Sequence, residues 1–382
     1  MIPFNKPFLT GNETHYIKEA VESGKISGNG LFTQKCQNYF EKEYGFKKAL
    51  LTTSCTDALE MAAILANIQP GDEVIIPSFT FVSTALAFVR QGAKVVFTDS
   101  NKWNPNIDVE LIEGLITEHT KAIIPVHYAG IACNMNKIMQ LAQKYNLLVI
   151  EDAAQAICGN YKNNEGKIQK LGSIGHMAAF SFHETKNVIS GEGGMLAIND
   201  NRFMERAEII WEKGTNRSQF FRGEVNKYNW KDIGSSFLPS EITAAFLWAQ
   251  LQNIDLIQLK RIKLWNIYHQ NLKDLYENAI IESPHIPNFA TNNGHIYYIL
   301  LNDSNVRDKL IAFLKSVGIM SVFHYLPLHS SDYYASKHDG RELPMSEKYS
   351  NCLLRLPMYF DLQEHEVQMI TDKIHEFFNQ QF

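Results

Sequence analysis

One lysine in an apolar setting is the first residue of this sequence that can do unusual chemistry. The strand-like run Met177–Phe182 is apolar, Lys186 follows it, and a glycine-rich turn ends at Gly194. Burial disfavours the charged form of a lysine and lowers its pKa. A neutral amine of this kind can form a Schiff base with an aldehyde. Taken alone, a solvated surface lysine is the simpler interpretation.

A carboxylate at the end of a second apolar run changes that interpretation. The segment LLVIEDAAQ, residues 147–155, leads to Asp152, and Gln155 follows. Carboxylates at the ends of buried parallel strands face the ligand crevice of an open α/β sheet. Pyridoxal phosphate needs an acid at its ring nitrogen and a lysine at its aldehyde. Asp152 and Lys186 together therefore predict a site for this cofactor.

A phosphate site would complete such a pocket, and the segment TTSCTDALEMAA, residues 52–63, supplies a candidate. A strand ends there, Ser54 and Thr56 occupy the turn, and a helix begins. Free backbone N–H groups and the positive helix end then converge on an anion. The alternative is that a hydroxyl only caps the helix. Phe81 can stack on a flat heteroaromatic ring, although a lone aromatic is also a common core residue.

Composition limits the class of protein. The chain has 382 residues, of which 45% are hydrophobic and 20% charged, which is typical of a globular protein with more than one domain. The net charge of −5, with scattered lysines and arginines, does not indicate nucleic-acid binding. We found no signal peptide and no apolar run of about 18 residues, and we expect a cytoplasmic protein. Five cysteines without a CxxC pair indicate reduced thiols.

The hydrophobic pattern alternates between strands and helices. Continuous apolar runs occupy residues 49–53, 73–79, 94–99, 121–128 and 147–152, with helical stretches between them. Strands of this kind predict a mostly parallel sheet that helices cover on both faces. The fold class is therefore α/β. We found no internal repeat and no G-x-G-x-x-G after the first strand, which argues against a Rossmann-type oxidoreductase or epimerase.

The regular alternation of strands and helices ends in the second part of the chain. A polar and aromatic loop over 214–236 is long enough to be functional, as an ordered lid or a partner contact. One long helix is predicted to begin after Ser240. We place the boundary near residue 255, between a large α/β domain over 1–254, which includes an N-terminal arm, and a small α+β domain over 255–382. Further along we expect strands at 295–301 and 319–326, and helices at 306–318 and 364–378.

The motifs together resemble one family. The sequence carries SGNG near its start, TSCTDALEMAA, PGDEVIIPSFTFVST, VIEDAAQ, FSFHETKN with GEGG, VFHYLPLHS and RLPMY. As a set they resemble, along the whole chain, the DegT/DnrJ/EryC1/StrS group of pyridoxal-phosphate aminotransferases that act on nucleotide-linked keto-sugars. The resemblance implies the fold-type I aminotransferase architecture.

The resemblance also implies roles for particular residues. Lys186 would carry the cofactor, Asp152 would hold the ring nitrogen, Gln155 would contact the ring hydroxyl, and Phe81 would stack on the ring. The phosphate would be lined by Ser54, Cys55, Thr56 and Ser181, with Cys55 standing where many relatives have glycine. In the family an Asn in a GYNYR-like motif reaches the phosphate from the other subunit of a homodimer. Here the matching stretch is GSSFL, which puts Ser236 at that position.

Candidates for substrate contacts are less specific. His183, His324, Tyr325 and His329 are candidates for the sugar or its diphosphate. Arg217 and Arg222 could hold the diphosphate or the carboxylate of an amino donor, or they could be solvated surface residues. We expect no metal, because the histidines lack acidic or cysteine partners at ligand spacing.

The expected reaction follows from the resemblance. SFHETKN, EKGTNRSQFFRG and DIGSS resemble enzymes that transfer an amino group from L-glutamate to TDP-4-keto-6-deoxy-D-glucose, giving a TDP-4-amino-4,6-dideoxyhexose of galacto configuration. Such enzymes serve surface polysaccharides such as enterobacterial common antigen, O-antigen and lipopolysaccharide. The alternatives are amination at C3, a UDP carrier, or a non-catalytic nucleotide-sugar-binding protein. A related dehydratase branch replaces the lysine, typically by histidine, and Lys186 argues against it.

Overall fold

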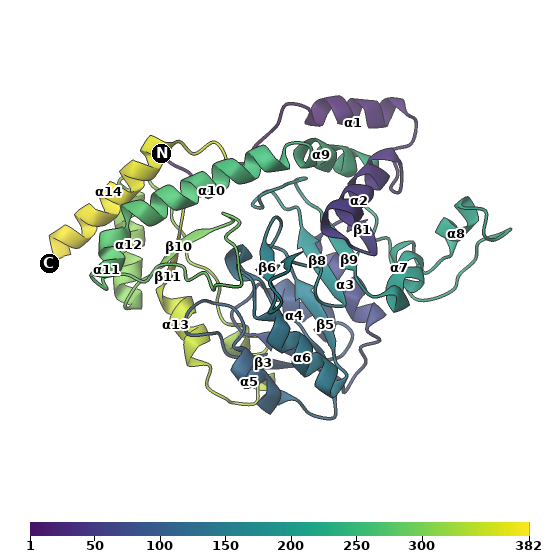
Figure 1. The fold of residues 1–382 in the computed structure, drawn as a ribbon, viewed down its shortest axis with the longest axis horizontal. Coiled ribbons are helices and arrows are strands. Elements are labelled where there is room, and N and C mark those ends of the chain that lie inside the picture. Colours follow the sequence, from purple (N-terminus) through teal and green to yellow (C-terminus); the bar gives the residue numbers. More distant parts are fainter. Residues whose placement is uncertain (382) are drawn as a thin grey trace.

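The computed structural model describes residues 1–381, and a seven-stranded mixed sheet lies at its centre (Figure 1). The spatial order is β1-β9-β8-β5-β4-β2-β3. Its strands are β1 (Lys48–Thr52), β2 (Glu73–Pro77), β3 (Lys94–Thr98), β4 (Thr120–Ile123), β5 (Leu148–Asp152), β8 (Met177–Ser181) and β9 (Gly194–Ile198).

Six of the seven strands run in the same direction. The pairs from β8 through β5, β4 and β2 to β3 are parallel, whereas β9 pairs antiparallel with both β1 and β8. The carboxyl ends of β1, β2, β5 and β8 therefore meet at one edge of the sheet, and the first residue of β9 lies there too. Ligands of open α/β sheets bind at this edge.

Helices cover both faces of the sheet, as the continuous apolar strands predicted (Figure 1). Buried residues of α2 (Leu31–Tyr44), α6 (Met135–Tyr145) and α9 (Glu241–Leu251) share one core with one face. Residues of α3 (Cys55–Leu65), α4 (Val82–Val89) and α7 (Met204–Trp211) pack in a second core on the other face. The remaining helices of this part are α1 (Glu13–Glu22), α5 (Val109–Ile112) and α8 (Arg217–Phe221), and β6 (Asn160–Lys162) pairs with β7 (Ile168–Lys170).

A smaller sheet and its helices form a third core near the C-terminus. Strand β10 (Tyr297–Leu300) pairs antiparallel with β11 (Leu353–Leu356). They are accompanied by α10 (Ile254–Asn271), α11 (Lys273–Glu277), α12 (Ser304–Ser316), α13 (Pro344–Cys352) and α14 (Glu364–Gln381). Leu264, Leu310, Leu354 and Ile370 are fully buried between these elements.

Two sequence predictions in this region were wrong. The single long helix after Ser240 is two helices, because Gln252 and Asn253 separate α9 from α10. The strand expected at 319–326 forms only isolated bridges, from Ile319 to Ile2 and from Val322 to Arg355. The boundary near residue 255 stays a prediction. No helix within residues 1–381 combines the length and apolar character needed to cross a membrane.

Candidate active site

A cavity of about 840 Å³ opens at the sheet edge where the carboxyl ends of the strands meet. Most of the residues predicted from the sequence line it. They are Ser54, Cys55, Thr56, Phe81, Asp152, Gln155, Ser181, His183, Lys186, His324 and Tyr325. The topology explains this gathering, because each of the first nine follows a strand of the same sheet or ends one.

Lys186 is held by a tight loop between β8 and β9. The backbone N–H of Phe182 donates to Gly193 O at 2.8 Å, and that of Glu184 donates to Gly191 O at 2.9 Å. The N–H of Lys186 itself donates to His183 O at 2.9 Å. Burial lowers the pKa of Lys186, while Cys55 and Asp152 oppose that shift and Arg355 adds to it. The loop therefore presents an amine that loses its proton more readily than a surface lysine.

The Asp152 carboxylate at the end of β5 has both oxygens fixed. Oδ2 accepts a hydrogen bond of 2.7 Å from the Thr84 hydroxyl, and Oδ1 accepts one of 3.1 Å from the Ala154 N–H. The residue is 4% exposed and lines the same cavity as Lys186. A buried carboxylate in a fixed position can hold a proton on a facing heterocyclic nitrogen.

The N-terminus of α3 lies at the same cavity. Ser54 caps the helix, because its Oγ accepts the Asp57 N–H at 3.0 Å, so the capping role considered for this residue is real. The N–H groups of Cys55 and Thr56, in the first turn, have no intrahelical acceptor. A Cβ on Gly194 would come within 2.4 Å of Cys55 N, so only glycine lets β9 start this close to the helix. The helix end is thus open to an anion.

A polar chain lines another wall of the cavity. The Gln155 side-chain amide donates to the Tyr325 hydroxyl at 3.1 Å, and its Oε1 accepts the Ala129 N–H at 2.6 Å. His324 Nδ1 lies 3.0 Å from the Tyr128 hydroxyl. Phe81 is 56% exposed, which a core residue would not be, and its ring centroid lies 6.1 Å from that of Tyr325. An exposed aromatic at a cavity mouth is free to stack on a planar ligand.

The structure does not bring the remaining predicted residues to this cavity. His329 bonds Ser78 Oγ at 2.7 Å through Nδ1 and lies 3.2 Å from Glu347 through Nε2. Arg222 pairs with Glu208 at 2.9 Å and with Glu224 at 2.7 Å.

Arg217 and Ser236 also lie outside the cavity of their own chain. Arg217 stacks its guanidinium 5.1 Å from the Phe221 ring centroid, and exposed Ser236 bridges to Glu212. His329, Arg217 and Arg222 therefore do not line the cavity of their own chain, and their contact with substrate stays a prediction.

Sequence reasoning missed several residues that line the cavity. Thr84 lies on α4, after β2, and its hydroxyl bonds that of Thr80, which precedes the helix by two residues; the spacing of four residues between them was the available signal. Phe4 and Asn5 come from the N-terminal arm. His295 and Arg355 come from the C-terminal part, and the motif RLPMY, which includes Arg355, was the available signal.

The site brings an amine of lowered pKa, a fixed carboxylate, an anion-binding helix end and an exposed aromatic into one cavity of an α/β fold. This combination fits pyridoxal phosphate, whose aldehyde, ring nitrogen, phosphate and ring each need one of these groups. The class that fold and site define is the fold-type I aminotransferase.

Comparison with known proteins identifies the family to which the chain belongs. The DegT/DnrJ/EryC1/StrS aminotransferase family matches residues 7–375, and the chain belongs to this family. It is a pyridoxal-phosphate-dependent sugar aminotransferase. GDP-perosamine synthase of Caulobacter vibrioides is 33% identical, with 95% of each chain covered.

Two further relatives have similar coverage. The spore coat polysaccharide biosynthesis protein SpsC of Bacillus subtilis is 30% identical over 98% of this chain and 96% of its own. The crystal structure of DesV from S. venezuelae is 28% identical, covers 98% of each chain and superposes with a TM-score of 0.89. The similarity therefore extends through both the large sheet and the small C-terminal sheet.

Proposed function

We propose that Lys186 Nζ carries the cofactor aldehyde, that Asp152 holds the proton on the ring nitrogen, and that the N-terminus of α3 with Ser181 binds the phosphate. The bound cofactor supplies an electron sink for the carbanion of the amino donor. Lys186 Nζ, once released, takes the proton from the donor α-carbon and later returns one to the new amine-bearing carbon. Asp152 keeps the ring nitrogen protonated, and Phe81 covers one face of the ring.

We propose further that the donor is L-glutamate and the acceptor is TDP-4-keto-6-deoxy-D-glucose. The product is then TDP-4-amino-4,6-dideoxygalactose, a precursor for surface polysaccharides of the enterobacterial common antigen type. The observation that carries this choice is the resemblance of SFHETKN, EKGTNRSQFFRG and DIGSS to C4-aminating enzymes. The first of these segments holds Lys186 and lines the cavity.

The other two segments support a homodimer with shared active sites. They pair with each other through a bridge from Glu212 to Ser236, and Thr215 of the first segment bridges to Trp230, just before the second. A Cβ on Gly214 would lie 1.8 Å from Asp232 O, so glycine is needed where the two segments touch. No residue of 212–236 is among those that line the cavity of its own chain.

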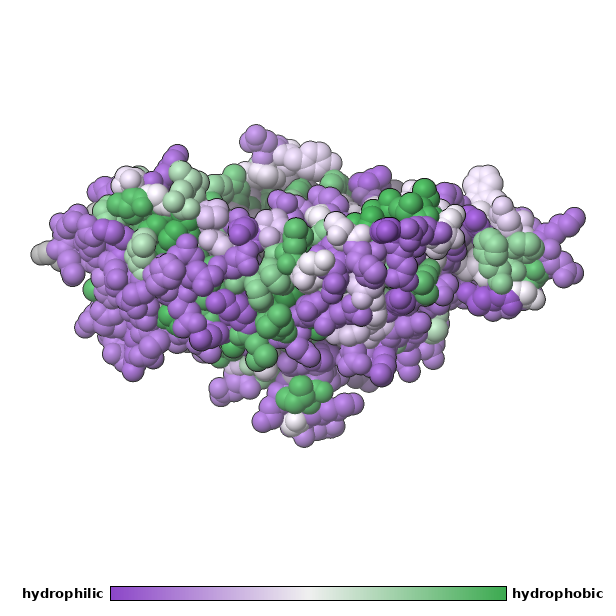
Figure 2. Space-filling model, turned by 90° about the horizontal axis from the view of Figure 1, so that it is seen from above, coloured by the Kyte–Doolittle hydropathy of each residue, from purple (hydrophilic) through white to green (hydrophobic). Residues whose placement is uncertain are grey.

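The loop also exposes an apolar surface at one end of the molecule. Figure 1 shows α8 projecting from the body, and Figure 2 shows one small apolar cluster among hydrophilic side chains at that end. The exposed fractions are 80% for Trp230, 67% for Phe221 and 49% for Tyr228. Large apolar groups exposed together are typical of an interface. A second copy of the chain, with the loop reaching the neighbouring cavity, would cover them.

The proposed reaction is tested by assaying the purified protein with L-glutamate against a panel of nucleotide-linked keto-sugars. The panel contains TDP-4-keto-6-deoxyglucose, its 3-keto isomer, and 4-keto-6-deoxy sugars on UDP and GDP. We expect the highest kcat/KM for the TDP-4-keto sugar, measured as 2-oxoglutarate released, and an axial C4 amine in the NMR spectrum of the product. A higher kcat/KM for any other sugar, or an equatorial amine, contradicts the proposal.

The GDP-linked 4-keto sugar is the second candidate acceptor. The observation in its favour is the name of the relative from Caulobacter vibrioides, which states a GDP-linked product. Its identity to this chain, 33%, is too low to carry a substrate over by itself. The nucleotide is therefore decided by the assay.

A further inference from the structure

His295 is a cavity residue to which the proposed roles assign nothing. It lies just before β10 in the C-terminal part of the chain, whereas Lys186 lies in the loop between β8 and β9. Both residues line the same cavity. Asn187, which follows Lys186 in the chain, bonds the His295 ring, because its Oδ1 lies 2.9 Å from Nδ1 of the imidazole. The two parts of the chain are therefore joined directly beside the lysine.

Asn187 determines which ring nitrogen of His295 carries the proton. The Asn187 Nδ2 donates to Asn293 O at 2.9 Å and to Gln258 Oε1 at 3.2 Å. A carbonyl oxygen can only accept, so the Asn187 amide cannot be turned the other way round. Its Oδ1 therefore accepts the hydrogen bond from Nδ1–H of His295. A neutral imidazole with its proton on Nδ1 carries a lone pair on Nε2.

The Nε2 lone pair of His295 is open to the cavity. Within residues 1–381 the ring makes its hydrogen bond through Nδ1 and none through Nε2, and Nε2 is not among the fully buried polar atoms that lack a partner. Since His295 is 7% exposed and lines the cavity, Nε2 is accessible from inside the cavity. The histidine thus presents a hydrogen-bond acceptor to the groups that react there.

The His295 ring stays neutral in this setting. Burial lowers the pKa of His295 well below its ordinary value, and the charges of Lys186, Arg261 and Arg355 lower it further. Burial lowers the pKa of His324, the other histidine of this wall, in the same direction. An ionised carboxylate or phosphate offers only acceptors, so neither can bond the Nε2 lone pair. The partner of Nε2 must therefore be an N–H or O–H group.

The backbone around His295 is fixed from both parts of the chain. Arg261 of α10 is 3% exposed, and it donates to His295 O at 2.7 Å and to Gly294 O at 2.9 Å. A Cβ on Gly294, whose φ is +60°, would lie 2.9 Å from Arg261 C. Asn293 Nδ2 donates to Gln155 O at 2.7 Å, after β5 of the large sheet. The imidazole is therefore held in position before a ligand enters.

Two donors can meet Nε2 during the reaction, a hydroxyl of the keto-sugar and Nζ of Lys186 after its release. The structure favours the lysine, because Asn187 is its neighbour in the chain and bonds the imidazole. The charge of Lys186 also lowers the pKa of His295 more than the charge of Arg261 does, although Arg261 bonds the carbonyl of the same histidine. The lysine amine therefore lies close to the ring.

We propose that Nε2 of His295 accepts a hydrogen bond from the released Nζ of Lys186 and so positions this amine between its two proton transfers. Asn187 is the positioning residue that keeps the lone pair directed into the cavity. The proton stays on the lysine, because the pKa of His295 is too low for the imidazole to take it. This role rests on the proposed function of Lys186, and it does not depend on which sugar is the acceptor.

The first test uses the full-length protein after removal of the cofactor, so it is independent of activity. The rate of pyridoxal-phosphate uptake is measured against pH for the wild type, His295→Asn and His295→Gln. A hydrogen bond from the ammonium favours the charged form of Lys186, so its loss in His295→Asn should move the midpoint down by about 1 pH unit.

The two variants differ at one atom position of the imidazole. Asparagine can still donate to Asn187 Oδ1, but it has no atom where Nε2 lies in His295. Glutamine reaches that position, and its amide oxygen can accept. The midpoint of His295→Gln should therefore lie closer to that of the wild type than the midpoint of His295→Asn does.

The second test follows the cofactor absorbance of the loaded enzyme in the two half-reactions. In His295→Asn the limiting rate with L-glutamate should fall about 10-fold to 100-fold, with a half-saturating concentration within about 2-fold of the wild type, since the amine is misplaced but the donor still binds. The half-reaction with the best keto-sugar of the panel should fall by a similar factor, because Lys186 acts in both. His119→Asn changes a side chain that is 63% exposed, and this control should match the wild type.

Either an unchanged midpoint or an unchanged limiting rate with L-glutamate in His295→Asn would overturn the proposal. A loss confined to the sugar half-reaction would also overturn it and assign Nε2 to a sugar hydroxyl. If His295→Asn does not fold, Asn187→Ser, which keeps the imidazole but no longer fixes its tautomer, decides by the same measurements. Failure of the proposed function is seen separately, as a wild type whose colour and activity survive Lys186→Ala.

Discussion

The hydroxyl of Thr84 donates a hydrogen bond of 2.7 Å to Oδ2 of Asp152, and Thr80 Oγ1 lies 2.9 Å from Thr84 Oγ1. Since the Thr84 proton is directed at the carboxylate, the Thr80 hydroxyl donates to Thr84. Thr84 lies in the first turn of α4, after β2, whereas Asp152 ends β5. The two threonines therefore orient the carboxylate that is proposed to hold the ring nitrogen, and they do so from the connection after β2, two strands away from β5.

Removing the Thr84 hydroxyl should slow transamination without unfolding the protein. A hydrogen bond to a charged group contributes about 1.5–3 kcal/mol, so we expect Thr84→Val to lower kcat by about 10-fold or more. Thr84→Ser keeps the hydroxyl and should stay within about 2-fold of the wild type. Asp152→Asn should retain the fold and much of the cofactor but lose more activity than Thr84→Val. Equal activity of Thr84→Val and the wild type would show that Asp152 does not need this hydroxyl.

Lys186 should be required for both the colour and the activity of the enzyme. The purified protein should be yellow, and Lys186→Ala should lose the absorbance of the lysine-linked cofactor together with transaminase activity. Lys42→Ala is a suitable control, because the Lys42 side chain is 84% exposed and does not line the cavity. A colourless wild type that takes up no added pyridoxal phosphate would contradict the assignment.

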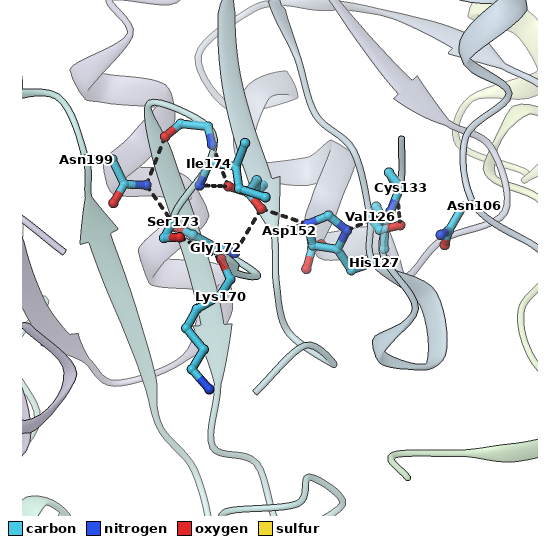
Figure 3. A network of polar contacts seen from close by, with 12 residues as sticks. Asn106, Val126, His127, Cys133, Asp152, Lys170, Gly172, Ser173, Ile174 and Asn199 are labelled. Atoms are coloured by element: carbon cyan, nitrogen blue, oxygen red, sulfur yellow. Dashed lines mark hydrogen bonds and ion pairs between the residues drawn. The ribbon is translucent and has the colours of Figure 1, made fainter. Parts of the chain in front are cut away.

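Next to Asp152 on β5, Glu151 forms a buried pair with His127 that fixes this strand (Figure 3). Glu151 Oε2 accepts hydrogen bonds of 2.8 Å from His127 Nε2 and from the Gly172 N–H, and Oε1 accepts the N–H groups of Ile174 and Gly175. His127 Nδ1 accepts the Cys133 N–H at 3.2 Å, which requires the proton to be on Nε2. Burial raises the pKa of Glu151, but these hydrogen bonds outweigh it, and the pKa lies below its ordinary value.

Glu151→Gln should therefore destabilise the protein strongly. Breaking a buried pair by changing one partner costs about 3–5 kcal/mol, which urea unfolding of the cofactor-loaded protein would measure. Because the pKa of folded Glu151 is lowered, its contribution is fully present above the ordinary glutamate pKa of 4.5 and is lost as the pH falls through the folded value. The difference between the wild type and Glu151→Gln should thus shrink as the pH falls below that value. If the difference in the free energy of unfolding grew as the pH fell, Glu151 would not carry the negative charge assigned to it.

The sequence predicted the strands of the large sheet and most of the cavity, because apolar runs and the residues after them are local features. It could not show that β9 is antiparallel, since an apolar run of five residues has no direction. It could not show that Arg355 and Lys186 line the same cavity, because Arg355 lies on β11 of the small sheet and Lys186 follows β8 of the large one. That His329 lies outside the cavity could not be predicted either. It follows Tyr325 closely in sequence, but a short 3-10 turn at Leu328–Ser330 directs it to Ser78.

The last prediction concerns whether two chains build each active site. If the loop around Ser236 reaches the neighbouring cofactor phosphate, Lys186→Ala and Ser236→Glu should each be inactive alone but complement each other. The glutamate would place a negative charge against the phosphate in every site of its own homodimer. In a mixed dimer one site carries both lesions and the other carries neither. Mixed dimers isolated by co-expression and purification through two different tags should then have about one half of the wild-type activity, because one of their two sites is intact.

A double variant provides the matched control for this experiment. A chain with both Lys186→Ala and Ser236→Glu, paired with a wild-type chain, gives two sites that each carry one lesion, so this mixed dimer should be inactive. A site built wholly within one chain predicts the reverse: the double variant would leave the wild-type partner active, and the two single variants would never complement. Because Ser236 is exposed and lies outside its own cavity, a charge there has little reason to disturb a site that is confined to one chain. The two experiments therefore separate a shared site from a site within one chain.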